Sequence, residues 1–567
     1  MALKQTAIFI LGPSALPLAQ KIKSELGGQI HGPEGIVGCD VNYEKATHAI
    51  SRAFMANHLI IGICASGILI RAVADHLKNK LDEPAVVAVS EDGSSVIPLL
   101  GGHHGANDMA AKIAAITNGH PAITTASDLM FGDLFDSPAG TMLSNLVDYK
   151  TAVAAKLRGE EIVQEVTIYN QQGGPHHLVY HPKTLAVGIG CERGADPKEV
   201  LKLLNDTLTK HNLSPRSVYK FGSIDLKEDE PAINQLAKSY FTAEELKAQT
   251  SRLLNPSTIV KDEVGTPSVA EAAALALVGP SGKLLVGKTK SKRATIAIAQ
   301  AISMAEIENN SGRMRGKVSV VGIGPGSTSM MTPAVEMELY YTTEWVGYSL
   351  YLDLVEELRR GQTRHDFPLG DEEARCRKAI ELAKQGEQVA LVCSGDAGIY
   401  AMAALVYEII DLEPCRVAVE VHPGISAFQA ASARAGAMIG HDFCCISLSD
   451  LLTPWEVIEK RLHAAAEGNF VISFYNPRSL KRRDQLERAF AILKNHRRPD
   501  TPVVIASNLG RPTEKTKIVN FADFNPEEVD MLTLVMVGST QSKSFMRGDG
   551  KTYAYTPRGY AKKRDIQ

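Results

Sequence analysis

Short apolar runs alternate with longer amphipathic segments along most of the chain, and the runs end in turns rich in glycine, serine or aspartate. This alternation is typical of βαβ units, in which buried parallel strands are joined by helices. In the first part of the chain it predicts strands over residues 7–11, 58–64 and 85–90. Helices are expected over residues 14–26 and from the glycine turn at 101 to about 118. The pattern therefore predicts an α/β fold.

The same pattern begins again twice further along the chain. After a less regular stretch at about 130–182, a new strand is expected at 185–189, and this unit continues through a strand at 283–286. Residues 306–315 are polar and contain Asn-Asn-Ser-Gly, which is typical of a linker. A β-branched run from Lys317 then predicts the first buried strand of another α/β unit. The chain therefore joins two α/β proteins.

Three turns in the last unit each follow a predicted strand. The first, Gly322-Ile-Gly-Pro-Gly326, lacks the glycine spacing of a dinucleotide fingerprint, and Pro325 removes a backbone donor that a pyrophosphate would use. No Gly-Lys-Ser/Thr follows, so it is not a phosphate-binding P-loop either. The other turns lie at 394–400 and 422–427. Since the carboxyl ends of parallel strands meet at one edge, we expect the three turns to form one crevice with an uncharged lining.

Composition narrows the class of protein. A length of 567 residues corresponds to three or four domains, and 44% apolar content is ample for several cores. The net charge of −3 gives no general reason to expect nucleic acid or a membrane surface as partner, and no apolar run approaches the roughly 20 residues of a membrane span. The apolar segment 7–12 is too short for a signal peptide. Eight cysteines without a CxxC pair favour a reduced, cytoplasmic location and no metal or disulfide framework.

Polar residues in the N-terminal half form a second set of candidates. Arg71 follows a predicted strand at an expected helix start, where its charge opposes the helix dipole, which indicates either an anionic substrate group or a surface salt bridge. His103 and His104 lie in a glycine-rich turn, and one of them is a candidate general acid or base, the other a capping or surface residue. Asp128 ends a polar run that begins at Thr124, which fits either a functional site or a hydrogen-bonded turn.

The three glycine turns resemble the signature turns of the tetrapyrrole (corrin/porphyrin) methyltransferases. Further segments are similar to the precorrin-3B C(17)-methyltransferase branch of that family: 347–352, 473–478 and 510–515. The resemblance covers about 317–560 and implies a two-lobed, class III methyltransferase that uses S-adenosylmethionine (SAM), usually as a homodimer. It also implies methylation of carbon 17 of a precorrin or cobalt-precorrin, coupled to contraction of the ring.

The resemblance also implies particular site residues. Carried over by position, the residues expected at the SAM are Gly324, Pro325, Gly395, Asp396, Ala397, Ile399, Ser426, Ala427 and Asn476. Asp396 is equally well explained as a carboxylate that caps a turn, and Tyr400 as a core residue. A precorrin carries many carboxylates, so cations in loops are candidate partners, and Arg478 and Arg511 are preferred over the basic residues at 481–483.

Motifs in the N-terminal half resemble cobalt-precorrin-5A hydrolase. They lie at 67–71, 99–107, 123–128, 188–194, 223–227, 255–257 and 268–272, and together they span about 1–300. The resemblance implies opening of a δ-lactone with release of acetaldehyde. Family members often have one histidine where this chain has two, so the choice between His103 and His104 stays open. Lys227, Glu230 and Glu271 are candidates for binding substrate or for plain ion pairs.

Together these patterns predict a bifunctional enzyme of cobalamin synthesis with a tetrapyrrole substrate. The expected divisions are 1–135, 136–182 and 183–305 for the hydrolase, 306–316 for the linker, and 317–440 and 441–567 for the two methyltransferase lobes. One alternative is methylation of another tetrapyrrole carbon, with an N-terminal half that binds tetrapyrrole without catalysis. Another is a nicotinamide-dependent oxidoreductase. Whether the substrate carries cobalt stays open.

Overall fold

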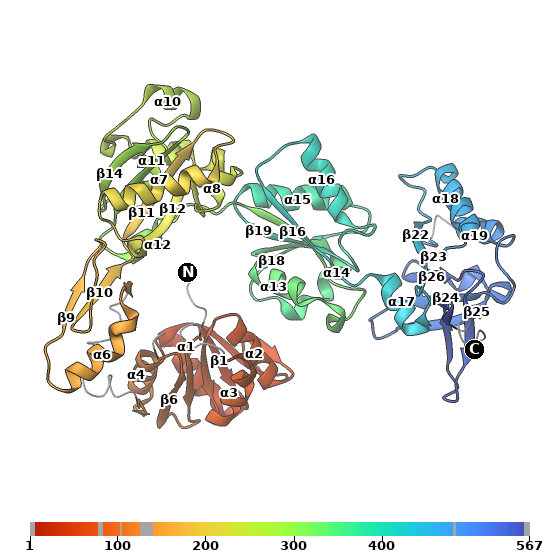
Figure 1. The fold of residues 1–567 in the computed structure, drawn as a ribbon. Helices are drawn as coiled ribbons and strands as arrows, with labels where there is room; N and C mark the ends of the chain where they lie inside the picture. Colours follow the sequence, from red (N-terminus) through yellow and green to blue (C-terminus); the bar gives the residue numbers. More distant parts are fainter. Residues whose placement is uncertain (1–5, 78–82, 103–104, 125–139, 480–482, 561–567) are drawn as a thin grey trace. The chain divides into compact units, whose positions relative to one another are not determined.

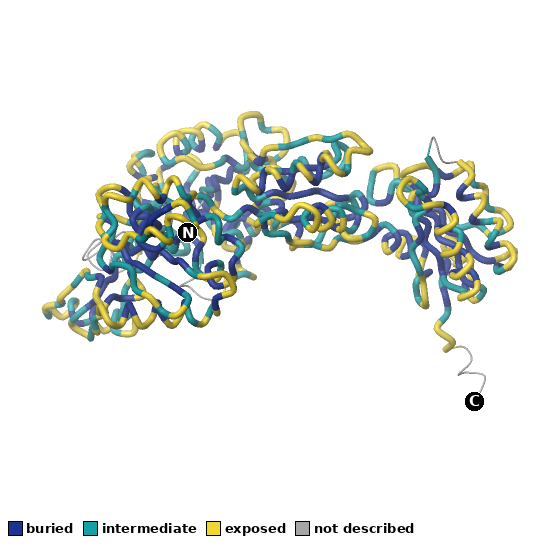
Figure 2. Tube along the Cα trace, turned by 90° about the horizontal axis from the view of Figure 1, so that it is seen from above, coloured by how far each residue is buried: buried dark blue, intermediate teal, exposed yellow. Residues whose placement is uncertain are grey.

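The computed structural model describes residues 6–77, 83–102, 105–124, 140–479 and 483–560. The chain divides into two compact units, which we treat separately. The first consists of Met1–Leu185, Asp206–Tyr219 and Ala301–Ile307, and the second of Ala186–Asn205, Lys220–Gln300 and Glu308–Gln567. Figure 2 shows buried segments running through the strands, while exposed segments follow the outer sides of the helices. No described helix has the length and apolar character that a membrane span requires.

The first unit contains a seven-stranded sheet in the order β3-β2-β1-β4-β5-β6-β7 (Figure 1). Its strands are β1 Thr6–Ile10, β2 Gln29–Pro33, β3 Val41–Tyr43, β4 Leu59–Ile63, β5 Val86–Val89, β6 Ser95–Leu100 and β7 His120–Pro121. Neighbours are parallel except for β5 and β6, which are antiparallel. The expected strands at 7–11, 58–64 and 85–90 are confirmed.

Helices cover both faces of this sheet. Helices α1 (Leu16–Leu26) and α4 (Ala106–Thr117) pack on the face that carries Ile8, Ile61 and Val87. Helices α2 (Ala46–Met55) and α3 (Ser66–Val73) pack on the face that carries Phe9, Ile60 and Val86. Successive strand residues point to opposite faces, so a continuous apolar run supplies both cores.

The stretch at 130–182, expected to be less regular, contains a small ordered sheet in its described part. Its elements are β8 Thr141–Leu143, α6 Leu146–Leu157, β9 Val163–Val166 and β10 His177–Pro182, and the strand order is β8-β10-β9. Ala152, Leu178 and Tyr180 form its core. Strand β9 is mostly exposed and carries Gln164 and Glu165, so no apolar run reveals it in the sequence.

The second unit begins with a five-stranded sheet in the order β13-β12-β11-β15-β14. Its strands are β11 Leu185–Cys191, β12 Val218–Ile224, β13 Ser239–Phe241, β14 Lys283–Lys290 and β15 Ala294–Gln300, and helix α11 (Ala270–Val278) packs on β14 and β15. The expected linker is partly helical, as α12 (Met304–Asn309). Beyond it, the backbone of Arg313 forms an isolated β-bridge with that of Tyr240, and the Arg313 side chain forms an ion pair with Glu228 at 2.7 Å. These contacts hold the segment against the sheet.

The next sheet is parallel throughout, in the order β18-β17-β19-β16-β20. Its strands are β16 Lys317–Gly322, β17 Glu344–Tyr348, β18 Thr363–Phe367, β19 Gln388–Cys393 and β20 Ala418–His422. Helices α15 (Glu372–Lys384) and α16 (Met402–Leu412) cover one face, and α13 (Pro333–Tyr341) covers the other. The predicted strands β19, β16 and β20 are direct neighbours, so the three glycine turns leave adjacent strands at the same edge.

The last lobe has a mixed sheet in the order β22-β23-β26-β24-β25. Its strands are β22 Phe443–Ser447, β23 Val471–Tyr475, β24 Pro502–Ser507, β25 Lys515–Asn520 and β26 Thr533–Val537. A small sheet of β21 (Gly436–Ala437), β28 (Thr552–Tyr555) and β27 (Lys543–Met546) lies beside it in the chain's last part. Helix α17 (Ala427–Ala435) packs its Phe428 and Ala431 against Val504 and Met536, so the packing of this lobe begins before residue 440.

Candidate functional site

The three glycine turns contact one another through their backbones. Gly324 N–H donates to the Gly395 carbonyl at 3.1 Å, and Gly395 N–H donates to the Gly324 carbonyl at 2.7 Å. A Cβ on Gly424 would lie 2.2 Å from the Gly395 oxygen and 2.3 Å from the Gly322 oxygen. A Cβ on Gly322 would lie 2.6 Å from the Gly395 oxygen. Glycine is required at these positions because the three turns approach more closely than any side chain allows.

Asp396 joins two of these turns. One of its carboxylate oxygens accepts a hydrogen bond from Gly398 N–H at 2.8 Å, and the other accepts one from Gly424 N–H at 3.1 Å. Both oxygens therefore stabilise backbone, which supports the turn-capping role left open above. The residue also lines the cavity described next.

A cavity of about 200 Å³ opens beside the glycine turns, and its walls come from both lobes of the second unit. Its lining includes the predicted residues Pro325, Gly395, Asp396, Ile399, Ser426, Ala427, Asn476 and Arg511. Two other predicted contacts, Gly324 and Ala397, do not line it, and Ala397 is fully buried. Residues 532–534 also line it, and they belong to the strand 532–537 that the resemblance places close to the SAM. The prediction missed Tyr351, Tyr475 and Asn508 as lining, although Tyr351 and Tyr475 fall within the segments 347–352 and 473–478 whose resemblance pointed to a site.

Two tyrosines connect the lobes at this cavity. Tyr475 OH lies 2.5 Å from Ser426 Oγ and accepts a hydrogen bond from Phe428 N–H, and burial raises the pKa of Tyr475 to about 12. The Tyr400 ring lies 5.2 Å from the Tyr475 ring. Tyr400 OH donates to the Cys445 carbonyl at 2.9 Å and accepts from Ser447 N–H at 3.2 Å.

Tyr400 is held in an unusual conformation for these contacts. Its φ of 51° lies in the left-handed region, which is costly for a bulky side chain. The residue is 53% exposed, so the alternative of a core residue, which the sequence left open, is wrong. Its hydroxyl instead pairs with the backbone of β22, the edge strand of the last lobe. Tyr400 therefore ties the turn at 394–400 to that strand.

The two predicted cationic residues have different surroundings. Arg511 lines the cavity, and its buried Nε has no hydrogen-bond partner among the described residues. Arg478 donates to the Pro526 carbonyl at 2.7 Å and to Glu527 Oε1 at 2.5 Å, and the second of these bonds lowers the pKa of Glu527. Arg511 thus has a donor at the cavity that no described residue uses, whereas Arg478 has an internal partner.

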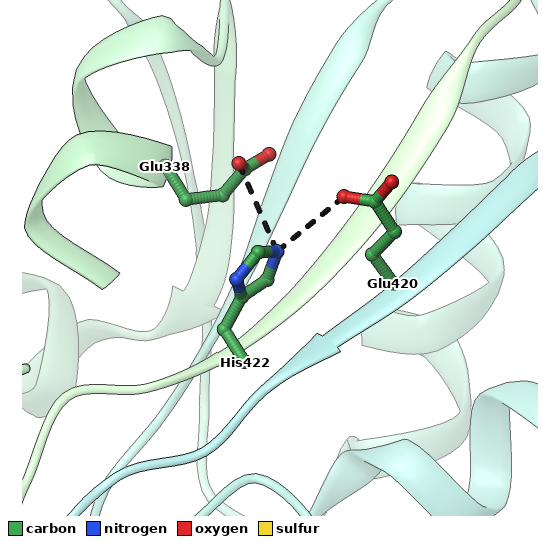
Figure 3. A group of neighbouring side chains, drawn as sticks. All are labelled: Glu338, Glu420 and His422. Carbon is green, nitrogen blue, oxygen red and sulfur yellow. Dashed lines mark ion pairs between the residues drawn. The ribbon is translucent and has the colours of Figure 1, made fainter. Parts of the chain in front are cut away.

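A separate polar cluster lies on one face of β16 and β20 (Figure 3). His422 Nε2 is 3.7 Å from Glu338 and 3.6 Å from Glu420, and Lys317 Nζ lies 2.5 Å from Glu338 and 3.1 Å from Glu420. Burial alone would raise the pKa of Glu338, but hydrogen bonds from Lys317 and Ser319 lower it below its ordinary value. The lysine ammonium already compensates these carboxylates, so the geometry supports an ion-pair network.

The candidates of the N-terminal half are only partly described. Arg71 lies in the last turn of α3, not at its start, and donates to the Gly67 carbonyl at 3.1 Å. The expected opposition to the helix dipole is therefore wrong, because a cation at a helix C-terminus complements it. His103, His104 and Asp128 lie outside the described residues.

Two acidic candidates of the following domain have structural partners. Glu271 is fully buried and accepts hydrogen bonds from Leu254 N–H, Lys288 N–H and both nitrogens of Asn255. Glu230 accepts from Gly194 N–H at 3.0 Å. Glu230 also lies 3.5 Å from the Arg193 guanidinium, which supports the ion-pair interpretation for this residue. The donors to Glu271 given above are uncharged, so its carboxylate holds backbone in place through hydrogen bonds.

The parallel sheet, its three contacting glycine turns and the adjoining second lobe define an α/β protein with a cavity at the carboxyl edge of its strands, the edge at which such folds bind small ligands. Family models match the chain accordingly. Tetrapyrrole (corrin/porphyrin) methylases match residues 317–525, the cobalamin synthesis G C-terminus matches 185–299, and the cobalamin synthesis G N-terminal region matches 48–128.

Curated relatives match the same part of the chain. A probable cobalt-factor III C(17)-methyltransferase of Salmonella typhimurium is 46% identical over 243 residues, which cover 43% of this chain and 99% of that protein. A precorrin-3B C(17)-methyltransferase of Sinorhizobium is 41% identical over 251 residues, or 44% of this chain and 98% of that protein. The cobalamin biosynthesis protein CobIJ of Mycobacterium tuberculosis is 45% identical over 251 residues, which cover 44% of this chain. This match spans only 49%, about half, of the length of CobIJ.

Solved structures resemble separate parts of the chain. The methyltransferase CobJ is 39% identical, with a TM-score of 0.40, over 43% of this chain and 100% of that chain. CobE, a protein of the cobalamin pathway, is 37% identical, with a TM-score of 0.20, over 21% of this chain and 91% of that chain.

The chain belongs to the tetrapyrrole methylase family, and two cobalamin synthesis G domains precede its methylase region. This confirms both resemblances seen in the sequence. Proteins of the methylase family use SAM as methyl donor, and their substrates are tetrapyrroles.

Proposed function

We propose that the methylase region, about 317–560, transfers a methyl group from SAM to carbon 17 of precorrin-3B or of its cobalt counterpart, with contraction of the ring. The observation that carries this proposal is the cavity that the glycine turns share with Arg511. The names of the Salmonella and Sinorhizobium relatives support the choice of carbon 17.

The residues present fit SAM. Gly395 is part of the cavity wall and has no side chain, so its backbone groups can come directly to the ligand. The orphaned Arg511 Nε suits a carboxylate, which both SAM and a tetrapyrrole carry. We propose that Pro325, Gly395, Ile399, Ser426, Ala427 and Asn476 contact the donor, and that Gly324, Asp396 and Ala397 support this wall from within.

When bound, SAM supplies an electrophilic methyl group. The protein's part in such a transfer is mainly to position the reacting atoms, since an activated methyl needs no strong base. Tyr400 and Tyr475 hold the two lobes in register beside the cavity. Arg511 is proposed to fix a carboxylate of the ligand, and Arg478 to stabilise the last lobe through Glu527.

For the region 1–305 we propose opening of the lactone of cobalt-precorrin-5A, with release of acetaldehyde. The matches to both cobalamin synthesis G domains support it. His103 and His104 stay candidate acid or base residues, with Asp128 and Arg71 as candidate substrate contacts. We further propose the domain divisions given above and a homodimer formed through the methylase region, which light scattering of the full chain tests.

Turnover of the full chain with SAM tests the methylation. Metal-free precorrin-3B and its cobalt counterpart are supplied side by side, and mass spectrometry with NMR locates the added methyl group. A methyl on carbon 17 of a contracted ring is expected. A methyl on another carbon would replace this proposal with the alternative methylase, and binding of NAD instead of SAM would replace it with an oxidoreductase.

A further inference from the structure

The N-terminal domain has a cavity of its own, of about 530 Å³, at the carboxyl ends of three parallel strands. Leu11 follows β1, the segment from Cys64 to Ser66 follows β4, and Ser90 and Glu91 follow β5. The sheet order β2-β1-β4-β5 means that the chain turns to one side after β1 and to the other after β4. Open α/β sheets bind ligands at this kind of switch point.

The lining of this cavity is chemically distinctive. Its walls are apolar, with Leu11, Ile68, Ala88, Val89 and Ile97, and its polar groups are hydroxyls, one thiol and the carboxylate of Glu91. Among the lining residues that the structure describes there is no lysine, arginine or histidine. Burial raises the pKa of the Cys64 thiol to about 11, with a further contribution from Glu91, so this thiol stays protonated at neutral pH and is a poor nucleophile.

Glu91 carries the one carboxylate among the described residues of the lining. It lies in the turn between β5 and β6, and its carboxylate accepts a hydrogen bond from Ser14 Oγ at 3.2 Å. This bond leaves acceptor capacity on both oxygens. A carboxylate at the rim of an apolar cavity can orient a water molecule and accept its proton.

The sheet register separates this cavity from the glycine turn that precedes α4. Strands β5 and β6 are antiparallel, with Val89 opposite Val96 at the cavity end and Val86 opposite Leu100 at the other end. Gly101 then lies against Ala85, because a Cβ on Gly101 would be 2.7 Å from the Ala85 Cα. The four residues of β5 span about 13 Å, so this turn starts at the opposite edge of the sheet.

We propose that this cavity binds the uncharged ester edge of the tetrapyrrole and that Glu91 is the general base for opening the lactone. The inference rests on the proposed hydrolase function and gives it a location. A cavity whose described lining holds a carboxylate and no cation repels the acetate and propionate arms of the substrate. The lactone is the part of such a molecule that is neutral and carries an alkyl group, so it matches the apolar walls and hydroxyls.

The chemistry balances without a further reactant. Glu91 accepts a proton from water as the water oxygen forms a bond to the ester carbonyl carbon. The bond between that carbon and the ring oxygen then breaks, and the alkoxide leaving group receives the proton from Glu91. The products of this step are one carboxylic acid and one alcohol, and the Glu91 carboxylate is restored. Acetaldehyde then forms when the alcohol loses its O–H proton and the bond between its carbon and the macrocycle breaks, with the electron pair of that bond and one proton retained by the macrocycle.

The test uses the full-length chain, with the lactone form of cobalt-precorrin-5A as probe and acetaldehyde release as the rate. Glu91→Gln keeps the shape and removes the base, so we expect kcat to fall by about 100-fold or more while KM stays within about threefold. Ala65→Phe fills the cavity from an exposed position, so KM is expected to rise about tenfold. Glu25→Gln, on the exposed side of α1, is the matched control.

Two other outcomes separate the location from the function. If Glu91→Gln hydrolyses at the wild-type rate while His103→Ala or His104→Ala abolishes release, the ester binds elsewhere and this proposal is overturned. If the wild-type chain releases no acetaldehyde, the hydrolase function fails. Spectroscopic titration of the protein with the lactone form of cobalt-precorrin-5A then still tests the location of the binding site. The Ala65→Phe variant is expected to bind fewer equivalents of this probe or to bind it more weakly, and binding equal to that of the wild type would overturn the proposed site.

Discussion

The contact among the glycine turns leads to a quantitative prediction for Gly424→Ala. The added methyl group would lie 2.2 Å from the Gly395 oxygen and 2.3 Å from the Gly322 oxygen. Both atoms belong to backbone, so no side chain can rotate to make room. Carbon–oxygen contacts below about 3 Å are not tolerated in protein interiors, and the turns must therefore move apart by about 0.8 Å.

This displacement has two costs. Overpacking in a well-packed region destabilises by about 1–3 kcal/mol. Moving the turn also weakens the hydrogen bond from Gly424 N–H to the Asp396 carboxylate, which measures 3.1 Å and is of a kind that contributes about 1.5–3 kcal/mol. We expect a total loss of about 3 kcal/mol, which lowers the melting temperature of a region of this size by about 6–12 °C.

Calorimetry of the full chain measures the unfolding of the methylase region, and isothermal titration measures SAM affinity. We expect the dissociation constant of SAM to rise at least tenfold, since the displaced turns form the proposed donor wall. Gly548→Ala is the control, because a Cβ there meets no atom within 4 Å. A Gly424→Ala variant with wild-type melting temperature and wild-type SAM affinity would refute the packing argument.

Three further predictions follow from other contacts. Tyr400→Phe removes two hydrogen bonds to β22 and should weaken SAM binding about tenfold by titration, whereas Tyr407→Phe, half exposed on α16, should have no effect. Arg511→Gln should raise the KM of SAM or tetrapyrrole at least tenfold with a melting temperature unchanged within about 2 °C; an unchanged KM for both ligands would contradict its role. Lys317→Met should cost about 2 kcal/mol in denaturant unfolding. The loss of stability should be largest between pH 4.5 and 10.5 and should shrink outside this window. The pKa of Glu338 is lowered by folding, so its stabilising contribution is lost as the pH falls through the lowered pKa; the pKa of Lys317 is raised by folding, so its contribution is lost as the pH rises through the raised pKa.

Much of the fold could be predicted because its signals are local. Continuous apolar runs such as 317–321 are buried on both faces of a parallel sheet, and the glycines that follow them mark the turns. The small sheet of β8, β9 and β10 could not be predicted, since β8 and β9 are short and have no buried residue, so no apolar run marks them. Helix α17 was expected with the preceding lobe because the chain order does not show which sheet covers it.

The candidate site divides in the same way. The residues at the carboxyl ends of adjacent strands, such as Gly395 and Ser426, were predicted to meet and do line one cavity. Arg478 and Arg511 are equivalent in sequence, each beside a proline in a loop. They differ because Glu527, 49 residues away along the chain, pairs with Arg478, while no described acid pairs with Arg511.

By itself, then, the sequence determined the alternation of strands and helices, the positions of the turns and the family of the methylase region. These depend on the order of residues along the chain. Only the tertiary structure decided which glycines touch, which arginine keeps a buried Nε that no described residue accepts from, and at which edge of the N-terminal sheet Glu91 and Gly101 lie. The physical reason is that steric contact, pairing of charges and strand direction depend on segments far apart in sequence, which come together only when the chain folds.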